Sequence, residues 1–535
     1  MKSCGTFMSI AGLCTLLTLC ASHETIAEES HAFDRSVRTA ENFEPAIPRP
    51  EQDKAVAAQL AKLKEKTGQR PNIVWLIVDD MGYGDPGCYG GGIVSGAATP
   101  NMDRLAREGL RLTSCYSQQT CTPTRSAILT GRLPVRTGLT RPILAGDKVT
   151  KNPWEGERSL AAILEDAGYA TLLVGKWHIG EAEGMRPHDV GFGEFYGYYP
   201  AQKEVSQRVD KRRYPNLLID KEKFAAFEGL KMGHSLVHGW KGGKTEELAS
   251  VASTEDIGRA DKVLADFSVA RIKELAKGDK PFFLEHCFMK VHCDNFANPD
   301  FEGMSASKYP YKDAVAEVDM HMGTIVKALE EAGVLENTFV FVTSDNGPQM
   351  DAWPDAGYTP FRGAKGTTFE GGVRVPGIAY WKGMIKPGRE SDDVFDLMDL
   401  FGTALTLAGV SKDQLSDDRY YDFVDQTSFL LHEEGRSKRE AVYFWWGSEL
   451  MACRVREYKA HVKIILPQVT HMYIDHAIVQ DTGLAPWFFN LYLDPKEEMT
   501  VGHRLSPWLA SVAAKLRTHG GTFKKFPPKD VGLGR

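Results

Sequence analysis

The sequence predicts an α/β sandwich in which a large, mostly parallel central sheet lies between helices, followed by a smaller C-terminal antiparallel-sheet subdomain. Continuous apolar runs, such as NIVWLIV at 72–78 and TFVFVT at 338–343, are typical of strands that are buried on both faces. Helix-like segments alternate with these runs, which is the order that a parallel sheet requires. After about residue 416 the segments become short and strand-like, which predicts the antiparallel layer.

The elements of the main domain, residues 71–415, are expected to follow this alternation. Thr99 and Pro100 open a helix as N-cap and first helical residue, and Gly109 ends it. The remaining expected elements are helices at 159–167, 261–276 and 311–332 and strands at 169–174, 281–284 and 338–343. A charged, irregular insert at about 201–253 interrupts the pattern, and long loops of this kind are usually functional or disordered.

The subdomain at 416–535 is expected to contain four strands and a final helix. The strand-like segments are 440–446, 452–458, 461–465 and 488–493, and the helix lies near 507–519. The chain has 535 residues, enough for two to four domains. Its 64 Lys and Arg against 71 Asp and Glu give a net charge of −7, and 42% of the residues are hydrophobic. This composition excludes a disordered or collagen-like chain and argues against a nucleic-acid partner.

The first 27 residues differ from the rest. A mostly apolar run at 7–20 follows Lys2 and precedes a small-x-small site at 25–27, which predicts a signal peptide that is too short to span a membrane comfortably. Cleavage at Ser22 is an alternative, and a lipoprotein attached through Cys20 is a weaker one. We find no second candidate span, so we expect a secreted or periplasmic protein with no stable membrane span. Residues 28–70 are expected to form an N-terminal extension with a helix near 55–64.

Acidic and amide side chains follow two of the predicted buried strands. Asp79 and Asp80 come directly after the strand at 72–78, and Asp345 and Asn346 follow the strand at 338–343. Ligands of open α/β sheets bind at the carboxyl ends of strands, where these side chains can converge. Carboxylate and amide oxygens suit calcium or magnesium rather than zinc. Turn-forming residues are common at such positions, but two matching strand ends favour a cation site.

Cys121 begins a CTPTR segment that ends with Arg125. The cysteine precedes an expected helix at 124–130. A helix start favours an anion, because its free amides and its dipole point at the ligand. A lone cysteine would otherwise be a buried thiol. Two further cysteines, Cys287 and Cys293, are close enough in sequence to pair in an oxidising compartment, or they are two buried thiols.

Residues 121–132 resemble the signature of the type I sulfatases, members of the alkaline phosphatase superfamily, with threonine at 124 where the family usually has serine. Other segments resemble family motifs in the same order: GKWHIG at 175–180, SDNGP at 344–348, the lysine-bearing GAKGTTFEGGVRVP at 363–376 and, more faintly, LYLDPKEE at 491–498. The resemblance implies an alkaline-phosphatase-like fold, with residues 71–415 as the sulfatase catalytic domain. It also implies arylsulfatase-like cleavage of a sulfate monoester.

The resemblance further implies how the reaction proceeds. Cys121 is converted to Cα-formylglycine by a formylglycine-generating maturation enzyme, and its hydrate attacks sulfur. A divalent cation, Ca²⁺ or alternatively Mg²⁺, is held by that hydrate and the acidic and amide side chains of the two strand ends. Arg125 holds the formylglycine hydroxyls, Lys176 and Lys365 contact sulfate oxygens, His292 with Lys365 protonates the leaving oxygen, and His178 helps to expel sulfate. The implied residues are Asp79, Asp80, Cys121, Arg125, Lys176, His178, His292, Asp345, Asn346 and Lys365.

Three alternatives remain open. His286 is the alternative to His292, because the proline that usually follows the family's histidine is absent here. A phosphonate monoester or phosphodiester hydrolase of the same superfamily would share the core motifs. An inactive secreted binding protein would lack a nucleophile or metal position, and none is missing.

The basic residues of the insert, among them Lys211, Arg212 and Arg213, could meet a polyanionic glycan or form an ordinary solvated face.

Overall fold

The computed structural model describes residues 34–144, 147, 149–215, 235–466, 478–483, 485–501 and 506–533. The predicted signal peptide lies outside these residues. Among the helices within them, none combines the length and the apolar character needed to cross a membrane.

A large mixed sheet forms the centre of residues 35–535 and confirms the predicted fold class. In spatial order, its strands within the described chain are β10 (Arg389–Ser391), β2 (Leu110–Tyr116), β9 (Arg374–Tyr380), β8 (Thr338–Ser344), β1 (Asn72–Val78), β7 (Phe282–Cys287), β3 (Ala170–Lys176), β4 (Glu194–Tyr198), β5 (Ser235–Trp240) and β6 (Lys244–Ser250), with β11 (Phe395–Asp396) also paired to β2. The five strands from β8 to β4 run parallel to one another. Strand β9 is antiparallel to both of its neighbours, and β5 and β6 form an antiparallel edge.

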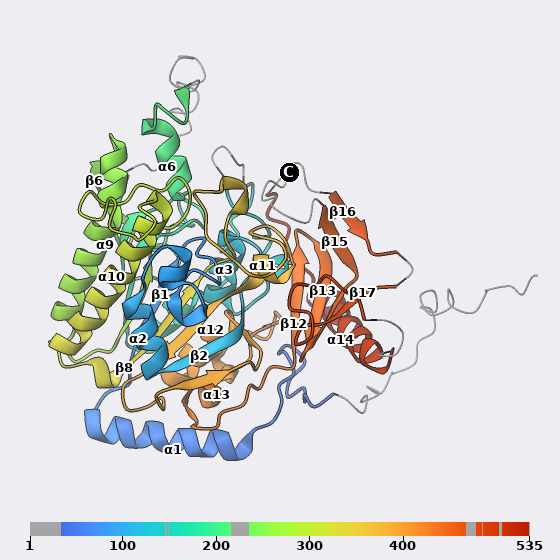
Figure 1. The fold of residues 1–535 in the computed structure, drawn as a ribbon. Coiled ribbons are helices and arrows are strands. Elements are labelled where there is room, and N and C mark those ends of the chain that lie inside the picture. Colours follow the sequence, from blue (N-terminus) through green and yellow to red (C-terminus); the bar gives the residue numbers. More distant parts are fainter. Residues whose placement is uncertain are drawn as a thin grey trace, which may run out of the picture. The chain divides into compact units, whose positions relative to one another are not determined.

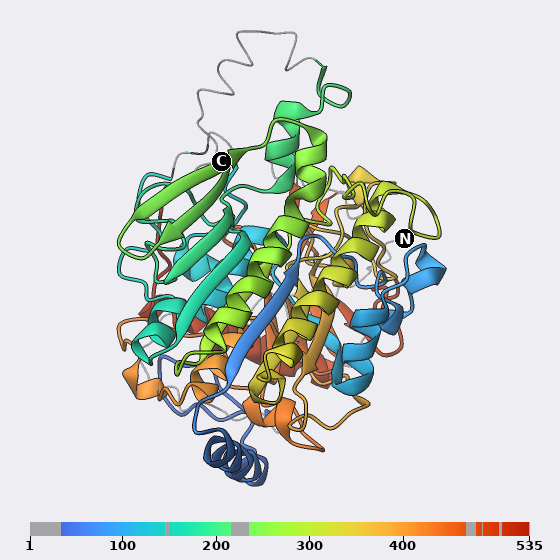
Figure 2. The same cartoon turned by 90° about the vertical axis from the view of Figure 1, so that its left-hand side faces the viewer.

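The central strand β1 is buried along its whole length because helices cover both faces of the sheet. Alternate side chains of a strand point to opposite faces. Ile73, Trp75 and Ile77 therefore pack into one core, and the residues between them pack into the other. Figure 2 shows α9 (Thr254–Leu275) and α10 (Pro310–Glu331) side by side across one face.

The helices divide between these two cores. Residues of α2 (Pro100–Glu108), α9 and α10 belong to one core. The other core receives residues of α1 (Pro50–Thr67), α3 (Cys121–Thr130), α4 (Pro134–Thr137), α5 (Leu160–Asp166), α12 (Asp399–Leu407) and α13 (Thr427–Leu431). Helix α9 begins seven residues before its predicted start, because Ser253 and Asp256 form a capping box.

The antiparallel layer consists of β12 (Ala441–Trp446), β13 (Glu449–Val455), β14 (Tyr458–His461) and β17 (Trp487–Asn490), with α14 (Ser506–Lys525) packed against β13 and β14 (Figure 1). The predicted strand at 452–458 is wrong at its C-terminal end, because Arg456 adopts a positive φ of 54° in the turn between β13 and β14. The predicted segment 461–465 falls mainly in β15 (Lys463–Leu466), which pairs with β16 (Ile478–Asp481) in a separate two-stranded sheet.

The prediction of an irregular insert at about 201–253 is wrong in part, because this segment contains regular secondary structure. Helix α6 (Gln202–Val209) and strands β5 and β6 lie within it, and the strands extend the large sheet. Residues 216–234 of this segment lie outside the described chain. The short α11 (Glu370–Val373) follows the loop that carries Lys365.

Candidate active site

The ends of two neighbouring parallel strands bring the predicted acidic residues together. Strands β1 and β8 are in register, with Val78 opposite Ser344, so the residues that follow them meet at one edge of the sheet. The backbone N–H of Asp80 donates to Asp345 Oδ1 at 3.2 Å, and Asn346 Nδ2 donates to Asp80 Oδ1 at 2.6 Å. These side chains and that of Asp79 are at most 1% exposed. The strand ends therefore meet as the sequence predicts.

Cys121 is the first residue of α3, after Thr120 as N-cap. The helix starts three residues earlier than predicted, which places Cys121 in its first turn. The Cys121 thiol lies 3.6 Å from Asp79 Oδ1 and donates to it. Side-chain atoms of Asp79, Asp80, Cys121 and Asp345 that could bind a metal all lie within 4.8 Å of one another. Burial raises the pKa of the Cys121 thiol, so an unmodified cysteine here stays protonated and is a poor nucleophile.

The rest of the CTPTR segment ties α3 to the strand ends. Arg125 Nε and Nη2 both donate to Asp345 Oδ2, at 3.0 and 2.8 Å, and Nη1 donates to the carbonyl oxygen of Lys176 at 3.1 Å. The hydroxyl of Thr124 accepts from the N–H of Gln118 at 3.0 Å. Threonine in place of the usual serine thus keeps a hydroxyl bonded to the loop before the helix.

Two lysines reach the same carboxylates. Lys176, at the end of β3, places Nζ 2.6 Å from Asp79 Oδ2, and Lys365 places Nζ 2.7 Å from Asp80 Oδ1. Burial alone would lower the pKa of each lysine, but Asp79 raises the pKa of Lys176 and Asp80 raises that of Lys365. Both lysines are therefore ammonium groups in a buried site, where they can stabilise an anion strongly.

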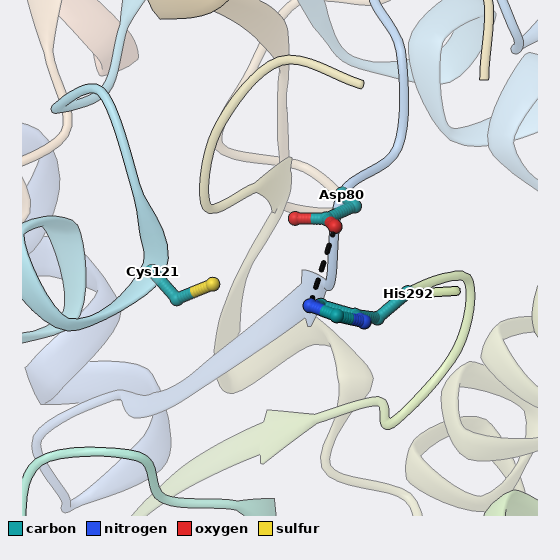
Figure 3. Close-up of side chains that lie close together, drawn as sticks. All are labelled: Asp80, Cys121 and His292. Carbon is teal, nitrogen blue, oxygen red and sulfur yellow. Dashed lines mark ion pairs between the residues drawn. The ribbon is translucent and has the colours of Figure 1, made fainter. Parts of the chain in front are cut away.

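The two histidines differ in the carboxylates that they contact: His292 lies against Asp80, and His178 Nε2 is 3.9 Å from Glu204 Oε2. His292 Nε2 is 3.5 Å from Asp80 Oδ2, and Figure 3 shows the ring directed at that carboxylate, with the Cys121 side chain directed toward the pair. His178 has a positive φ of 59°, and neither of its ring nitrogens has a hydrogen-bond partner among the described residues. Burial lowers the pKa of both histidines, and Lys176 lowers that of His178 further. The alternative, His286, lies elsewhere: its Nδ1 is 2.8 Å from Ser268 Oγ on α9.

The oxygen atoms at the two strand ends have the character of a divalent-cation site. Asn346 Oδ1 is buried without a hydrogen-bond partner among the described residues, beside the carboxylates of both strand ends. An unpartnered buried acceptor costs free energy unless a ligand satisfies it. Oxygen donors from three carboxylates and one amide match the ligands that Ca²⁺ and Mg²⁺ prefer. The residues present therefore fit such an ion.

Sequence reasoning did not identify one residue that supports the site. Gln202, on α6, is buried, and its Nε2 donates to the carbonyl oxygens of His292 at 2.9 Å and Asp294 at 2.6 Å. The helix starts at a capping interaction in which Glu204 Oε2 accepts from the N–H of Ala201 at 2.8 Å. A glutamate three residues after the N-cap position was the available signal for this helix.

The six described cysteines, including Cys287 and Cys293, are all unpaired, and both of these thiols are buried. They correspond to the alternative of two buried thiols.

Comparisons with known proteins agree on one family. The Sulfatase family model matches residues 71–410. An N-acetylgalactosamine-6-sulfatase from Canis lupus familiaris is 35% identical over 404 residues, which cover 74% of this chain and 72% of the relative. Arylsulfatase A from Homo sapiens is 33% identical over 417 residues, which cover 76% of each chain.

Solved structures agree with this result. The crystal structure of the PsFucS1 sulfatase from Pseudoalteromonas sp. matches with a TM-score of 0.90 and 49% identity, and the match covers 93% of this chain and 99% of that chain. Ps i-CgsB in complex with k-i-k-neocarrahexaose has a TM-score of 0.66 and 21% identity, over 87% of this chain and 100% of that chain, and this likeness shows the fold alone.

Proposed function

The chain belongs to the sulfatase family and is an enzyme that hydrolyses sulfate esters, and from this premise we propose that its nucleophile is a formylglycine made from Cys121. The observation that carries the proposal is the place of Cys121 at a helix start beside three buried carboxylates and two lysines. The protonated thiol of Cys121 could not attack a sulfate ester efficiently, so the residue at this place in the cluster must be modified before it can act as the nucleophile.

The cation would be held by Asp79, Asp80, Asp345 and Asn346, together with the modified residue 121. When present, the hydrated aldehyde supplies an oxygen nucleophile and the cation supplies positive charge beside the sulfate. Calcium is the ion we favour, with magnesium as the alternative, because the donors are all oxygen. Removing the cation would leave several buried carboxylates facing one another, so we expect the melting temperature to fall on chelation and to recover with Ca²⁺.

The chain's own groups then divide the remaining work. Lys176 and Lys365 are charged and lie against the carboxylates, where their Nζ atoms can turn to sulfate oxygens. His292 donates from Nδ1 to the carbonyl oxygen of Cys293, so its Nε2 can deliver a proton to the leaving oxygen only when the ring is protonated as an imidazolium. His178 Nε2 lies 3.9 Å from Glu204 Oε2, and neither ring nitrogen makes a hydrogen bond among the described residues, so the ring is placed to accept a proton as sulfate departs. Arg125 holds the Asp345 carboxylate in position through two hydrogen bonds to Oδ2.

We propose a sulfated carbohydrate as the substrate and a secreted or periplasmic location. The N-acetylgalactosamine-6-sulfatases among the relatives support a sugar sulfate. The location rests on the apolar run and small-x-small site of the first 27 residues. Modification of Cys121 makes a formylglycine-generating maturation enzyme a necessary partner.

The decisive experiment is mass spectrometry of the tryptic peptide 112–125 from protein made with such a maturation enzyme. This peptide contains both Cys115 and Cys121. After alkylation, Cys115 should carry the thiol label while residue 121 has the mass of an aldehyde and no label. Sulfate release from sugar sulfates should then accompany the modified fraction. A labelled Cys121 in fully active protein, or turnover of phosphonate esters but not sulfate esters, would overturn the proposal.

A further inference from the structure

The loop that carries Lys365 is closed on itself. At its base, the N–H of Gly371 donates to the carbonyl oxygen of Arg362 at 2.7 Å. Its inner side meets the segment that leads into α3, because the N–H of Gly366 donates to the carbonyl oxygen of Gln119 at 2.7 Å. A loop that is closed in this way moves as one body. Contacts elsewhere on the loop can therefore displace Lys365 from the active site.

The outer side of the same loop meets the antiparallel layer, and Figure 1 shows α11, which follows the loop, beside that layer. Lys459, on β14, donates from Nζ to the carbonyl oxygen of Thr368 at 2.8 Å and to Glu370 Oε1 at 2.9 Å. Glu497, in the segment after β17, accepts through Oε2 from the N–H of Glu370 at 2.7 Å. Its Oε1 lies 3.1 Å from Lys459 Nζ, so the two side chains bind each other as well as the loop.

Alternation along β14 directs Lys459 at this loop. Successive side chains of a strand point to opposite faces. Tyr458 and Ala460 pack into the small hydrophobic core that α14 also joins, so Lys459 and His461 point the other way. Both of these polar side chains are fully buried, and His461 Nε2 is 2.6 Å from Glu497 Oε1. Buried charged and polar groups need partners, and Glu497 contacts both of them.

The backbone of Glu497 indicates that its side chain is needed at this place. Its φ is 55°, in the left-handed region that favours glycine. Residues held in this way cost free energy and persist where the surrounding structure requires them. Glu497 belongs to the LYLDPKEE segment, in which Asp494 Oδ2 accepts from the N–H groups of Glu498 and Met499 at 2.9 and 2.8 Å. The segment thus forms a turn that presents one glutamate to the loop.

The contacts between the loop and the antiparallel layer are ionic. Burial would raise the pKa of Glu370, but Lys459 opposes burial more strongly and the pKa falls to about 2. Glu370 is therefore a carboxylate, and it is fully buried, as are Lys459 and Glu497. Removing one partner would leave the others as uncompensated buried charges. Because Glu370 begins directly after the loop, the resulting rearrangement would shift the loop itself.

We propose that Lys459 and Glu497 are positioning residues for Lys365, and that they hold the outer side of its loop so that the ammonium group faces the sulfate. The proposal rests on the proposed function, in which Lys365 contacts sulfate oxygens. Both residues are fully buried, so they act without touching the substrate. The antiparallel layer, and the LYLDPKEE segment in particular, thereby takes part in the reaction.

The test is a double-mutant cycle on enzyme whose formylglycine content has been measured. Lys459→Met removes the charge and its hydrogen bonds but keeps an unbranched side chain, and Glu497→Gln removes only the charge. Each substitution is also combined with Lys365→Ala. Lys496→Met and Glu498→Gln make the same changes at exposed residues of the LYLDPKEE segment and are the matched controls. Melting temperatures report whether each variant retains the fold.

We expect kcat/KM for a sulfate ester to fall by roughly 10–10²-fold in Lys459→Met, because a small displacement of a charged group is costly. The fall should be smaller in Glu497→Gln, since the amide can still accept from the N–H of Glu370. In the Lys365→Ala background, both substitutions should change kcat/KM by less than about twofold, because the group that they position is gone. The controls should match the wild type.

Two results would overturn the positioning role. One is wild-type kcat/KM in both Lys459→Met and Glu497→Gln. The other is a loss that is equally large with and without Lys365, which would make the ionic contacts a general structural feature. Glu497→Gln decides the question if Lys459→Met does not fold. Wild-type activity of Lys365→Ala in fully modified enzyme would instead count against the proposed function.

Discussion

The sulfate end and the leaving-group end of this site are built differently. At the sulfate end, Asp79, Lys176 and Asp345 are fully buried, and they come from the ends of parallel strands whose register fixes their spacing. At the leaving-group end, around the His292 loop, Arg213 keeps 38% of its side chain exposed, and the neighbouring residues come from α6 and loops. Because the strand ends are rigid and the loops can vary in sequence without disturbing the sheet, the first end suits the common reaction and the second suits selection among substrates.

The largest effect should follow from removing the nucleophile at the sulfate end. We expect Cys121→Ala to lower kcat by roughly 10⁴-fold or more on every substrate, because no other side chain can replace the modified residue. Sulfate release measured by ion chromatography would check this. Cys88→Ala, a half-buried cysteine outside the cluster, should retain activity. Activity that falls on sugar sulfates but persists on aryl sulfates would break the division between the two ends.

His292 lies where the two ends meet, so its loss should depend on the leaving group. A nitrophenolate leaves without a proton, whereas a sugar alkoxide needs one. We expect His292→Ala to lower kcat/KM for a sugar sulfate by roughly 10²–10⁴-fold and for 4-nitrophenyl sulfate by far less. A series of substrates with increasing leaving-group pKa should give a steeper dependence in the variant. His432→Ala serves as control, and parallel slopes would remove His292 from the role of acid.

The same contrast separates what the sequence predicted from what it did not. The strand ends belong to local patterns, since a continuous apolar run followed by acidic residues indicates a buried strand and its tip, and the cysteine precedes an expected helix. Both lysines were predicted only from the resemblance to family motifs. Strand β1 was predicted with the bounds that it has in the structure. The roles of these residues remain proposals.

The leaving-group end gave weaker signals, because its contacts join segments that are distant in the sequence. Gln202 binds a carbonyl 90 positions away, and Asp355 binds the N–H of Asn295, 60 positions away. No periodicity marks a single glutamine or aspartate that acts through tertiary contacts. The charged composition of the segment with α6 suggested a solvated or polyanion-binding face, whereas in the structure Arg213 is directed at carboxylates.

A buried carboxyl group lies in the protein interior next to the sulfate end. Glu285, on β7, is 1% exposed and its Oε2 has no hydrogen-bond partner among the described residues. Burial raises its pKa to about 7, although Arg125 opposes the shift. The folded protein therefore binds a proton that the unfolded chain releases near pH 4.5. Stability from this group is present below pH 4.5 and is lost as the pH rises to about 7, at up to roughly 1.4 kcal/mol per pH unit.

Urea unfolding of the wild type and Glu285→Gln between pH 5 and 8 would measure this loss. The amide does not titrate, so the variant should gain stability relative to the wild type as the pH rises, and the difference should level off above pH 7. Other titrating groups cancel in the comparison. Curves that stay parallel over this range would mean that water reaches Glu285 and that the sulfate end is less dry than its burial indicates.

The smallest effect should come from Gln202, which touches no substrate in this scheme and acts by positioning His292. Gln202→Leu removes both hydrogen bonds to the backbone of the His292 loop. We expect kcat on a sugar sulfate to fall by roughly tenfold, because a small displacement of an acid is costly, with little change in KM. Activity on 4-nitrophenyl sulfate should fall less. Gln207→Leu makes the same substitution later in α6 and should behave as the wild type. If Gln202→Leu instead lowers both activities equally, or only raises KM, then α6 stabilises the fold or binds substrate directly, and the leaving-group end does not control the acid through its backbone.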